Sequence, residues 1–337
     1  MKKLLVVSVG DINKASSRAR VFWVFPRINK LQTKIKVSNN PLDILILFFT
    51  VHNYQIIIFQ KVFSRWHLYL LWYLKYLGKS IYLDIDDFPS RSFSEVTLKN
   101  FQRFSESVHG ISCGNINLLN YCLLYNKNSF LIPTCIDVDL YGQYNLKLND
   151  KKVIVGWIGN GSHYEEELIW FVNEIVTPLT KHYLETPLQF CFIGVKNCNK
   201  LFSLIESLKL TDKFAMIEDL NWSDTQEVSS WIGKFDIGIY PLLEQNFNLY
   251  KCGFKALEYG ACGVPTVASN ILGMNAYINN GVTGMLCDKS DDWISQIRLL
   301  IHNTKLRNEI GFNAQMHVRN EYSVKKAVSI WENKMNL

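Results

Sequence analysis

The residues best suited to chemistry lie in the stretch 250–269, YKCGFKALEYGACGVPTVAS. Lys251, Lys255 and Glu258 are four and three residues apart, which places them on one edge of a helix that begins near Gly253. Ammonium groups beside the free N–H groups of a helix start suit a diphosphate. Glu258, one turn further on, can accept hydrogen bonds from sugar hydroxyls. By spacing alone, an ordinary amphipathic helix with a solvated Lys/Glu edge fits equally well.

An acidic run is the second candidate for chemistry. Asp84, Asp86 and Asp87 follow a predicted strand at 80–83. Hard carboxylate ligands at the end of a strand can hold Mg²⁺ or Mn²⁺. In a simpler interpretation, Asp84 caps a helix and the run binds no ligand. The residues alone leave both interpretations open.

A short glycine-rich loop is the third candidate. It follows a predicted strand at 153–158 and consists of Gly159, Asn160, Gly161 and Ser162. Glycines at a strand-to-helix turn let the backbone approach a phosphate closely. A tight turn without any ligand produces the same pattern.

Two α/β domains are expected to position these residues, because apolar runs alternate with helical patterns in both halves. A polar linker is expected near 143–151, and a helical tail from 291 to 337 with breaks near Asn303 and Glu321. A helix is also expected around 21–28. The predicted strands are 4–10, 43–49, 55–59, 80–83 and 108–113 in the first half, and 153–158, 189–193, 213–217, 235–239 and 266–268 in the second.

Composition restricts the class of protein. The 337 residues are 48% hydrophobic and 20% charged, as in a globular protein large enough for two cores. No apolar run approaches the roughly 20 residues that span a bilayer, and the apolar start suits a buried strand better than a signal peptide. We therefore expect a cytoplasmic chain whose eight cysteines, which lack metal-binding spacing, are reduced thiols.

The charge is unevenly distributed. Residues 1–145 contain 17 Lys and Arg against 9 Asp and Glu, whereas the remainder contains 19 against 21. A basic N-terminal half suits an acceptor that carries phosphate, or an anionic membrane surface. Nucleic acid is disfavoured as a partner because no binding motif is present.

An aromatic helix with scattered basic residues is expected within 61–82. The simpler interpretation is a crossover helix that packs on a parallel sheet. The alternative is that one edge also rests on a membrane, where Trp and Tyr together with Lys and Arg are favoured.

The run 251–269, followed by Asn275, Gly281 and Gly284 and then by DDW, LRNEIG and EYS, resembles the nucleotide-sugar half-site of the retaining GT-B glycosyltransferases called group 1, or family 4. The resemblance implies two doubly wound Rossmann-like domains that face each other across a cleft. It assigns 1–145 to an acceptor-binding domain and 146–320 to a nucleotide-sugar-binding domain. Residues 321–337 would form a final helix that packs back on the first domain.

The resemblance also assigns roles within the donor half. Glu258 matches the acid that contacts the donor ribose, but the family's first acid, eight residues earlier, is Tyr250 here. Glu244 either replaces that acid from an enlarged loop or is a plain surface residue. The family's Arg and Lys after the first strand of this domain are absent as well. We therefore expect Lys251 and Lys255, with Gly253 and the loop 159–162, to bind the diphosphate.

In the first half, Ser16, Ser17, Arg18 and Arg20 resemble an N-terminal signature of one branch of the family. Ser16 and Arg18 are expected to bind the acceptor, with Arg18 on an acceptor phosphate or else on the donor diphosphate. Without the resemblance, a solvated turn followed by helix residues is the simpler interpretation. Because a metal-binding DxD is a feature of the different GT-A class, we expect Asp86 and Asp87 to act as acceptor ligands or as a base. No metal site and no cofactor is expected. The candidate catalytic residues are Glu244, Lys255, Asp86 and Asp87.

The expected function is transfer of a hexose-type sugar, with retention, from a nucleoside-diphosphate sugar to a glycan or lipid-linked acceptor. By resemblance, the setting is the synthesis of a bacterial surface polysaccharide or lipopolysaccharide, in the cytoplasm or peripherally on the inner face of the membrane. Two alternatives are a nucleotide-sugar epimerase on the same fold and a non-catalytic protein that binds sugar nucleotides.

Overall fold

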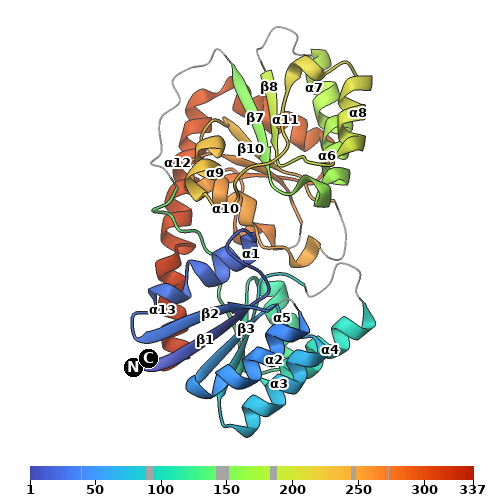
Figure 1. Cartoon of the computed structure of the whole chain (residues 1–337). Coiled ribbons are helices and arrows are strands. Elements are labelled where there is room, and N and C mark those ends of the chain that lie inside the picture. The colour runs from blue at the N-terminus through green and yellow to red at the C-terminus, as the bar shows by residue number, and fades with distance from the viewer. Residues whose placement is uncertain (39, 89–93, 142–151, 183–187, 244–247, 272) are drawn as a thin grey trace. The chain divides into compact units, whose positions relative to one another are not determined.

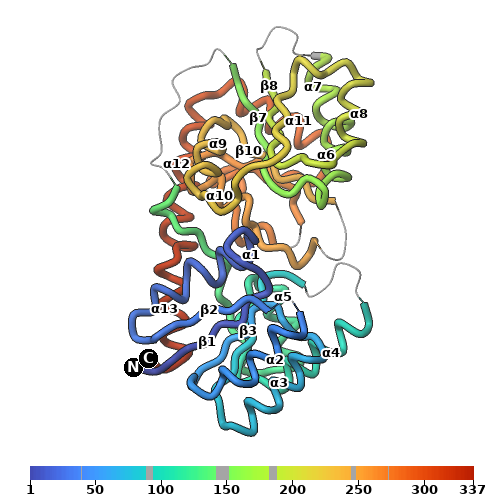
Figure 2. The backbone as a smooth tube through the Cα atoms, viewed as in Figure 1, coloured from blue at the N-terminus to red at the C-terminus, as the bar shows by residue number. Residues whose placement is uncertain are grey.

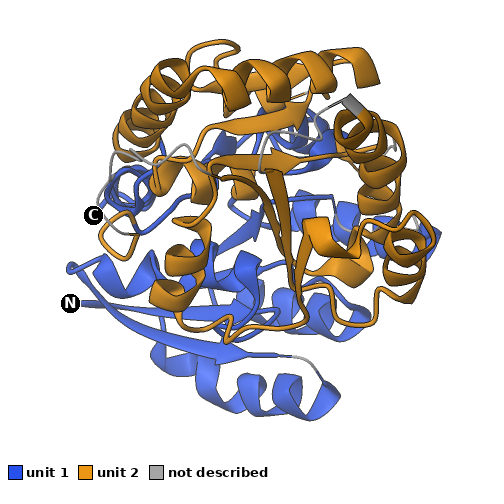
Figure 3. Ribbon diagram, turned by 90° about the horizontal axis from the view of Figure 1, so that it is seen from above, with its two compact units in different colours: residues 1–137, 249–252, 322–337 blue, residues 138–248, 253–321 orange. Residues whose placement is uncertain are grey.

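The computed structural model describes residues 1–337 except 39, 89–93, 142–151, 183–187, 244–247 and 272 (Figure 1). Contacts divide the chain into two compact units, coloured separately in Figure 3. Unit 1 comprises residues 1–137, 249–252 and 322–337, and unit 2 comprises 138–248 and 253–321. Each unit is built on one parallel sheet, so the predicted fold class of two doubly wound α/β domains is confirmed.

Unit 1 has a sheet of six parallel strands in the order β2-β1-β3-β4-β5-β6. Most residues of the central strands are apolar and buried, as expected where helices cover both faces of a sheet. The strands are β1 (Lys2–Ser8), β2 (Leu31–Val37), β3 (Ile56–Gln60), β4 (Ser80–Ile85), β5 (Gly110–Cys113) and β6 (Ser129–Leu131). The main helices are α2 (Pro41–Thr50), α3 (Arg65–Tyr76), α4 (Glu95–Ser107), α5 (Ile116–Leu123) and α13 (Val324–Lys334).

The C-terminal helix α13 belongs to unit 1. Its Trp331 is buried, with ring centroids 5.4 Å from Phe25, 5.9 Å from Tyr82 and 5.5 Å from Phe130. The main chain just before the helix also contacts the rest of unit 1, because Ser323 forms a parallel β-bridge with Ile136. The path of the chain from α12 into α13 can be followed at the red end of the tube in Figure 2.

Unit 2 has a sheet of six parallel strands in the order β12-β11-β10-β7-β8-β9. They are β7 (Val153–Ile158), β8 (Leu188–Ile193), β9 (Phe214–Ile217), β10 (Ile237–Tyr240), β11 (Thr266–Ser269) and β12 (Gly284–Cys287). Its helices include α6 (Glu165–Phe171), α7 (Thr177–His182), α8 (Asn199–Ser207), α9 (Thr225–Ile232), α10 (Phe254–Ala261), α11 (Ser290–His302) and α12 (Thr304–Glu321).

The strand orders locate the switch points at which ligands bind in open α/β sheets. In unit 1 the chain runs from β1 to β2 on one side and then returns to β3 on the other side of β1. In unit 2 it runs from β7 outward to β9 and then returns to β10 on the other side of β7. The crevices beyond the carboxyl ends of β1 and β3, and of β7 and β10, are therefore the places to search for a site.

One predicted strand is wrong. Residues 43–49 lie in the helix α2, which begins with a capping box: Asn40 accepts from the backbone of Asp43, and the Asp43 side chain accepts from the backbone of Asn40. Pro41 at the first helical position also favours a helix start. The run shows no helical period because α2 is apolar on its exposed face as well as its buried one.

The region after β1 also differs from prediction. Instead of a helix around 21–28, a π-helical turn at Arg18–Phe22 is followed by a 3-10 turn at Phe25–Arg27 that contains Pro26. Proline cannot supply the N–H that a continuing helix needs. The following strand β2, Leu31–Val37, was not predicted.

Candidate functional site

The switch point of unit 2 brings Lys255 and the glycine-rich loop together. Lys255 is the second residue of α10, and a Cβ added to Gly159 would lie 2.7 Å from its Cε and 2.8 Å from its Nζ. Any side chain at position 159 would therefore displace the lysine. Gly161 is equally crowded, because its added Cβ would lie 2.8 Å from the carbonyl oxygen of Gly194. The predicted donor residues 159 and 255 are thus direct neighbours.

Lys255 is buried among aromatic rings. Lys255 is only 8% exposed, and its Nζ lies 3.9 Å from the ring centroid of Tyr164. The rings of Trp157 and Tyr240, from β7 and β10, lie 5.2 Å away. Ring faces attract a cation. A buried ammonium in the first turn of a helix attracts an anion strongly, because its charge adds to that of the helix N-terminus.

Glu258 lies one turn further along α10 and is also buried. Its Oε1 accepts a hydrogen bond of 2.9 Å from the hydroxyl of Tyr141, which is itself buried. A carboxylate held in this way keeps a fixed orientation, which a ligand for ribose hydroxyls requires. Tyr141 was not identified from the sequence, because nothing in its local pattern indicates a partner 117 residues away.

Lys251 does not share the helix edge with Lys255 and Glu258, so that part of the prediction is wrong. The helix begins at Phe254, after Gly253, and residues 249–252 belong to unit 1. Gly253 is required by packing, because a Cβ there would lie 2.5 Å from the ring of Tyr277.

Two other donor candidates and one catalytic candidate complete the predicted set in this half. Asn160 and Ser162 are exposed, and the Ser162 hydroxyl donates to Oδ1 of Asn160 at 2.8 Å. Their polar groups lie in the same loop as Gly159. Glu244 lies outside the described residues.

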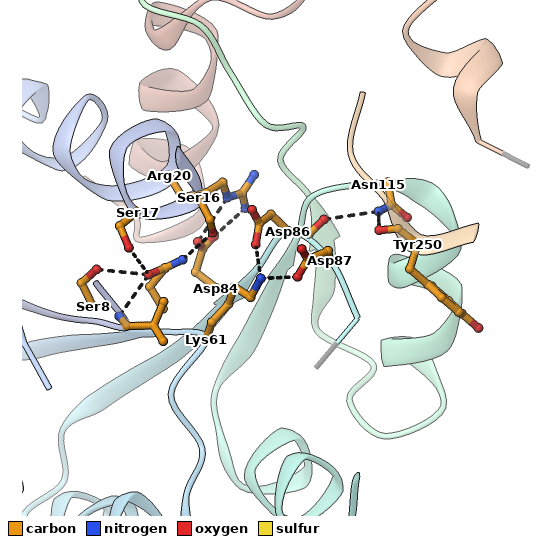
Figure 4. Close-up of polar contacts among 12 residues, drawn as sticks. Ser8, Ser16, Ser17, Arg20, Lys61, Asp84, Asp86, Asp87, Asn115 and Tyr250 are labelled. Atoms are coloured by element: carbon orange, nitrogen blue, oxygen red, sulfur yellow. Dashed lines mark hydrogen bonds and ion pairs between the residues drawn. The ribbon is translucent and has the colours of Figure 1, made fainter. Parts of the chain in front are cut away.

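In unit 1, Asp84 at the end of β4 is part of a buried ion pair (Figure 4). Arg20 Nη2 lies 2.5 Å from Oδ1 of Asp84, and Arg20 Nε lies 3.2 Å from Oδ2. The Ser112 hydroxyl also donates to Oδ1 at 2.7 Å. Asp84 therefore has a structural role: it neither caps a helix nor presents a vacant carboxylate to a metal. Within the described residues, no group of three His, Cys, Asp or Glu side chains is arranged to hold a metal ion.

Asp86 and Asp87 share the ammonium group of Lys61, the residue after β3. Lys61 Nζ lies 3.2 Å from Oδ1 of Asp86 and also contacts Oδ1 of Asp87. Lys61 has a φ of 53°, in the left-handed region that residues with a Cβ seldom adopt and that recurs at functional sites. Sequence reasoning missed this lysine, because no motif marks it.

The electrostatic surroundings separate the two aspartates. Burial raises the pKa of Asp86, but the charges of Lys61 and Arg20 together lower it by more, so the net shift is downward. Burial and the charge of Asp86 raise the pKa of Asp87, and Lys61 only partly offsets them. Paired carboxylates with opposite shifts are suited to acid–base work, with one ionised and the other able to hold a proton.

The loop after β1 surrounds this cluster. At the β1/β3 switch point, Gln60 donates to the Ser16 hydroxyl at 2.9 Å, and Ser16 hydrogen-bonds to Asp86. Arg18 is buried, and its Nη1 donates to the carbonyl oxygens of Ile12 at 3.3 Å and Asn13 at 3.4 Å. Ser16 is thus close to the carboxylates, whereas Arg18 braces its own loop.

Tyr250, which stands where the resemblance places the first acid, is packed within unit 1. Its ring centroid lies 4.7 Å from that of Phe88, and its carbonyl oxygen accepts from Asn115 Nδ2 at 2.8 Å. The same Asn115 amide also donates to the carbonyl oxygen of Asp86 at 3.4 Å. The adjacent Lys251 contributes a positive charge that acts to lower the pKa of Asp87.

Comparison with known proteins bears on unit 2 most directly. Residues 152–303, from β7 through α11 and including Lys255 and Glu258, match the family described as glycosyl transferases group 1. The match covers most of unit 2 and none of the first 151 residues. A stretch of 93 residues is 33% identical to a D-inositol 3-phosphate glycosyltransferase of Paenarthrobacter aurescens, and it covers 27% of this chain but only 22% of that protein's length.

Solved structures extend the likeness of the group 1 segment to the whole fold. The Anabaena protein Alr3699/HepE, solved in complex with UDP, is 14% identical, with a TM-score of 0.78 over 100% of both chains. Sucrose-phosphate synthase from Thermosynechococcus elongatus is 12% identical, with a TM-score of 0.74 over 100% of this chain and 98% of that chain. At these identities the likeness shows the fold, which is GT-B.

Proposed function

We propose that this protein transfers a sugar, with retention, from a nucleoside-diphosphate sugar to a glycan or lipid-linked acceptor. The observation that carries the proposal is the buried Lys255 ammonium at the β7/β10 switch point, beside Gly159 and one turn before Glu258. A cation held in the first turn of a helix suits the diphosphate, and Glu258 suits the ribose. The likeness to a structure solved with UDP supports a donor of this class.

The chemistry follows from this division of tasks. The bond between the anomeric carbon and the diphosphate oxygen breaks, and the Lys255 ammonium stabilises the charge that develops on the departing diphosphate. The acceptor hydroxyl oxygen bonds to the anomeric carbon on the same face, without a covalent enzyme intermediate. Asp86 and Asp87 bind the acceptor hydroxyl or take its proton, with Ser16 as a further acceptor ligand. Glu244 remains the candidate for the missing first acid.

The acceptor is proposed to carry phosphate. Besides Lys61, which the carboxylates engage, unit 1 contributes Lys14 and Lys251, whose charges interact with Asp86 or Asp87. The curated relative named above acts, by its name, on an inositol phosphate. A role in surface polysaccharide or lipopolysaccharide synthesis, in the cytoplasm, is part of the same proposal.

The decisive experiment removes the Lys255 ammonium. The Lys255→Ala variant should lose kcat on the order of 10²–10³-fold, and more kcat than nucleotide affinity, because the ammonium acts mainly on the departing charge. Lys255→Arg need not restore turnover, since a planar guanidinium does not replace a compact ammonium beside these rings.

Lys234 provides a matched control in the same unit. It also lies over an aromatic ring, 3.5 Å from the centroid of Trp231, but it is exposed. Lys234→Ala should leave turnover unchanged. Near-normal turnover of Lys255→Ala would refute the proposed clamp and direct the search for the phosphate site to residues 159–163.

A non-catalytic role in binding sugar nucleotides is the second candidate, favoured by Tyr250 in place of the first acid. An epimerase on the same fold is an enzymatic alternative. Purified protein that hydrolyses a nucleotide sugar slowly, and faster with acceptor, would establish a transferase. Binding without turnover would favour the non-catalytic role, and interconversion of free nucleotide sugars would favour the epimerase.

A further inference from the structure

Helices α2 and α3 of unit 1 expose an unusual number of large apolar side chains. Of the 19 large hydrophobic residues that are exposed in the described part of the chain, eight lie on these two helices. This concentration distinguishes the surface from single exposed apolar residues, which are normal. The eight residues, called the α2–α3 face below, are Leu42, Leu45, Ile46, Phe49, Trp66, Tyr69, Trp72 and Tyr76.

The aromatic part of this face is continuous. Trp66, Tyr69 and Trp72 are three residues apart along α3, and successive ring centroids are 5.8 Å and 5.7 Å apart. Phe48 and Tyr73, with centroids 5.5 Å apart, join α2 to α3. The two helices lie next to each other in unit 1 (Figure 1).

The opposite sides of both helices form the core. Ile44 and Leu47 of α2 are buried, as are Leu70, Leu71 and Leu74 of α3. Each helix therefore already covers the sheet with one apolar side and presents a second one outward. A helix that only packs on a sheet needs a single apolar stripe, so the second stripe calls for another partner.

The charges near the face are almost all positive. Helix α3 contains Arg65 and Lys75 and no acidic residue, and Lys79 follows it. The single acid of α2, Asp43, is engaged in the capping box with Asn40. Trp and Tyr beside Arg and Lys are the side chains favoured where a protein meets the lipid headgroups.

We propose that the α2–α3 face docks on an anionic phospholipid surface. The rings and the α2 leucines would enter the headgroup region, and Arg65, Lys75 and Lys79 would face lipid phosphates. A second copy of this chain is a poorer partner, because a two-fold interface would set these cations against one another. The proposal concerns binding alone and does not depend on the transfer chemistry.

Cosedimentation of the full chain with lipid vesicles tests the proposal. The chain should bind vesicles of phosphatidylcholine containing phosphatidylglycerol, bind weakly to phosphatidylcholine alone, and dissociate as salt is raised. Trp66→Ser with Trp72→Ser should lower the partition coefficient on the order of tenfold or more. Phe312→Ser, at an exposed aromatic residue of unit 2, is the matched control and should change nothing. Lipids with brominated acyl chains should quench the tryptophan fluorescence of wild type more than that of the double variant.

A second variant protects the test against misfolding. If the double variant melts below wild type, Arg65→Glu with Lys75→Glu keeps the aromatic rings and should lower binding about fivefold or more per charge. Wild type that ignores anionic vesicles would overturn the proposal. So would a concentration-dependent dimer that the tryptophan substitutions abolish, which would assign the face to a second copy. Activity on a water-soluble acceptor should be equal in all variants, so a failure here is distinguishable from a failure of the proposed function.

Discussion

Replacing Arg20 by methionine should destabilise unit 1 by about 3–5 kcal/mol, the usual consequence of removing one partner of a buried ion pair. Arg20 and Asp84 are 3% and 0% exposed, so water cannot replace the lost guanidinium. The arginine also donates to the Ser112 hydroxyl at 2.8 Å and to the carbonyl oxygen of Ile132. Methionine preserves much of the packing, so the loss should be mainly electrostatic.

Urea denaturation of wild type, Arg20→Met, Asp84→Asn and the double variant measures the coupling between the two residues. The double variant removes both charges, so it should recover most of the loss and give a coupling energy of at least about 2 kcal/mol. A coupling energy near zero, or a loss below about 1 kcal/mol for Arg20→Met, would refute the assignment of Asp84 to a structural ion pair. Asp84 would then become available again as an acceptor or metal ligand.

Three further predictions address the remaining groups. Glu258→Ala should weaken nucleotide binding by about 1–3 kcal/mol with the fold intact, and Tyr141→Phe should have a smaller effect. Calorimetric titration with nucleoside diphosphates measures both, and an unchanged affinity of Glu258→Ala would show that Glu258 does not contact the nucleotide. Activity should survive EDTA, because Lys255 and backbone N–H groups neutralise the diphosphate. Activity that is lost on chelation and recovered on addition of Mn²⁺ or Mg²⁺ would contradict this prediction. Burial lowers the pKa of His67 to about 4. As pH falls below about 6.5 the unfolded chain takes up the proton first, so the folded state loses stability, by about 2 kcal/mol at pH 5. In His67→Gln the denaturation midpoint should depend less on pH over that range, and an unchanged dependence would show that His67 is not responsible.

Elements with a clear period and clear ends were predictable from the sequence. The strand 153–158 and the breaks near Asn303 and Glu321 match the structure, because apolar runs and local breaks are encoded by neighbouring residues. Helix α2 was not predictable from its apolar run, since its outer face is apolar too. The signal for this helix is local: Asn40, Pro41 and Asp43 form a helix start.

The candidate site shows the same limit at longer range. The neighbourhood of Gly159 and Lys255 follows from a strand order that places their loop and helix at one switch point. The role of Lys61 could not be derived, because it depends on a left-handed residue after β3 meeting carboxylates 25 and 26 residues away. The pairing of Arg20 with Asp84 spans 64 residues, and no local pattern distinguishes this arginine from Arg18.

The two switch points differ in how they treat charge, and this difference indicates different tasks. In unit 2 the Lys255 ammonium lies beside the rings of Trp157, Tyr164 and Tyr240, whose faces attract a cation but carry no net charge. In unit 1 the cations Arg20 and Lys61 are already engaged by carboxylates, which leaves hydrogen-bonding oxygens and one aspartate with a raised pKa. A neutral or weakly charged group such as an acceptor hydroxyl suits this second environment, because it can exchange a proton there without disturbing the ion pairs. Variants at Asp87 should therefore alter the pH profile of turnover, whereas variants at Lys255 should change its magnitude at every pH.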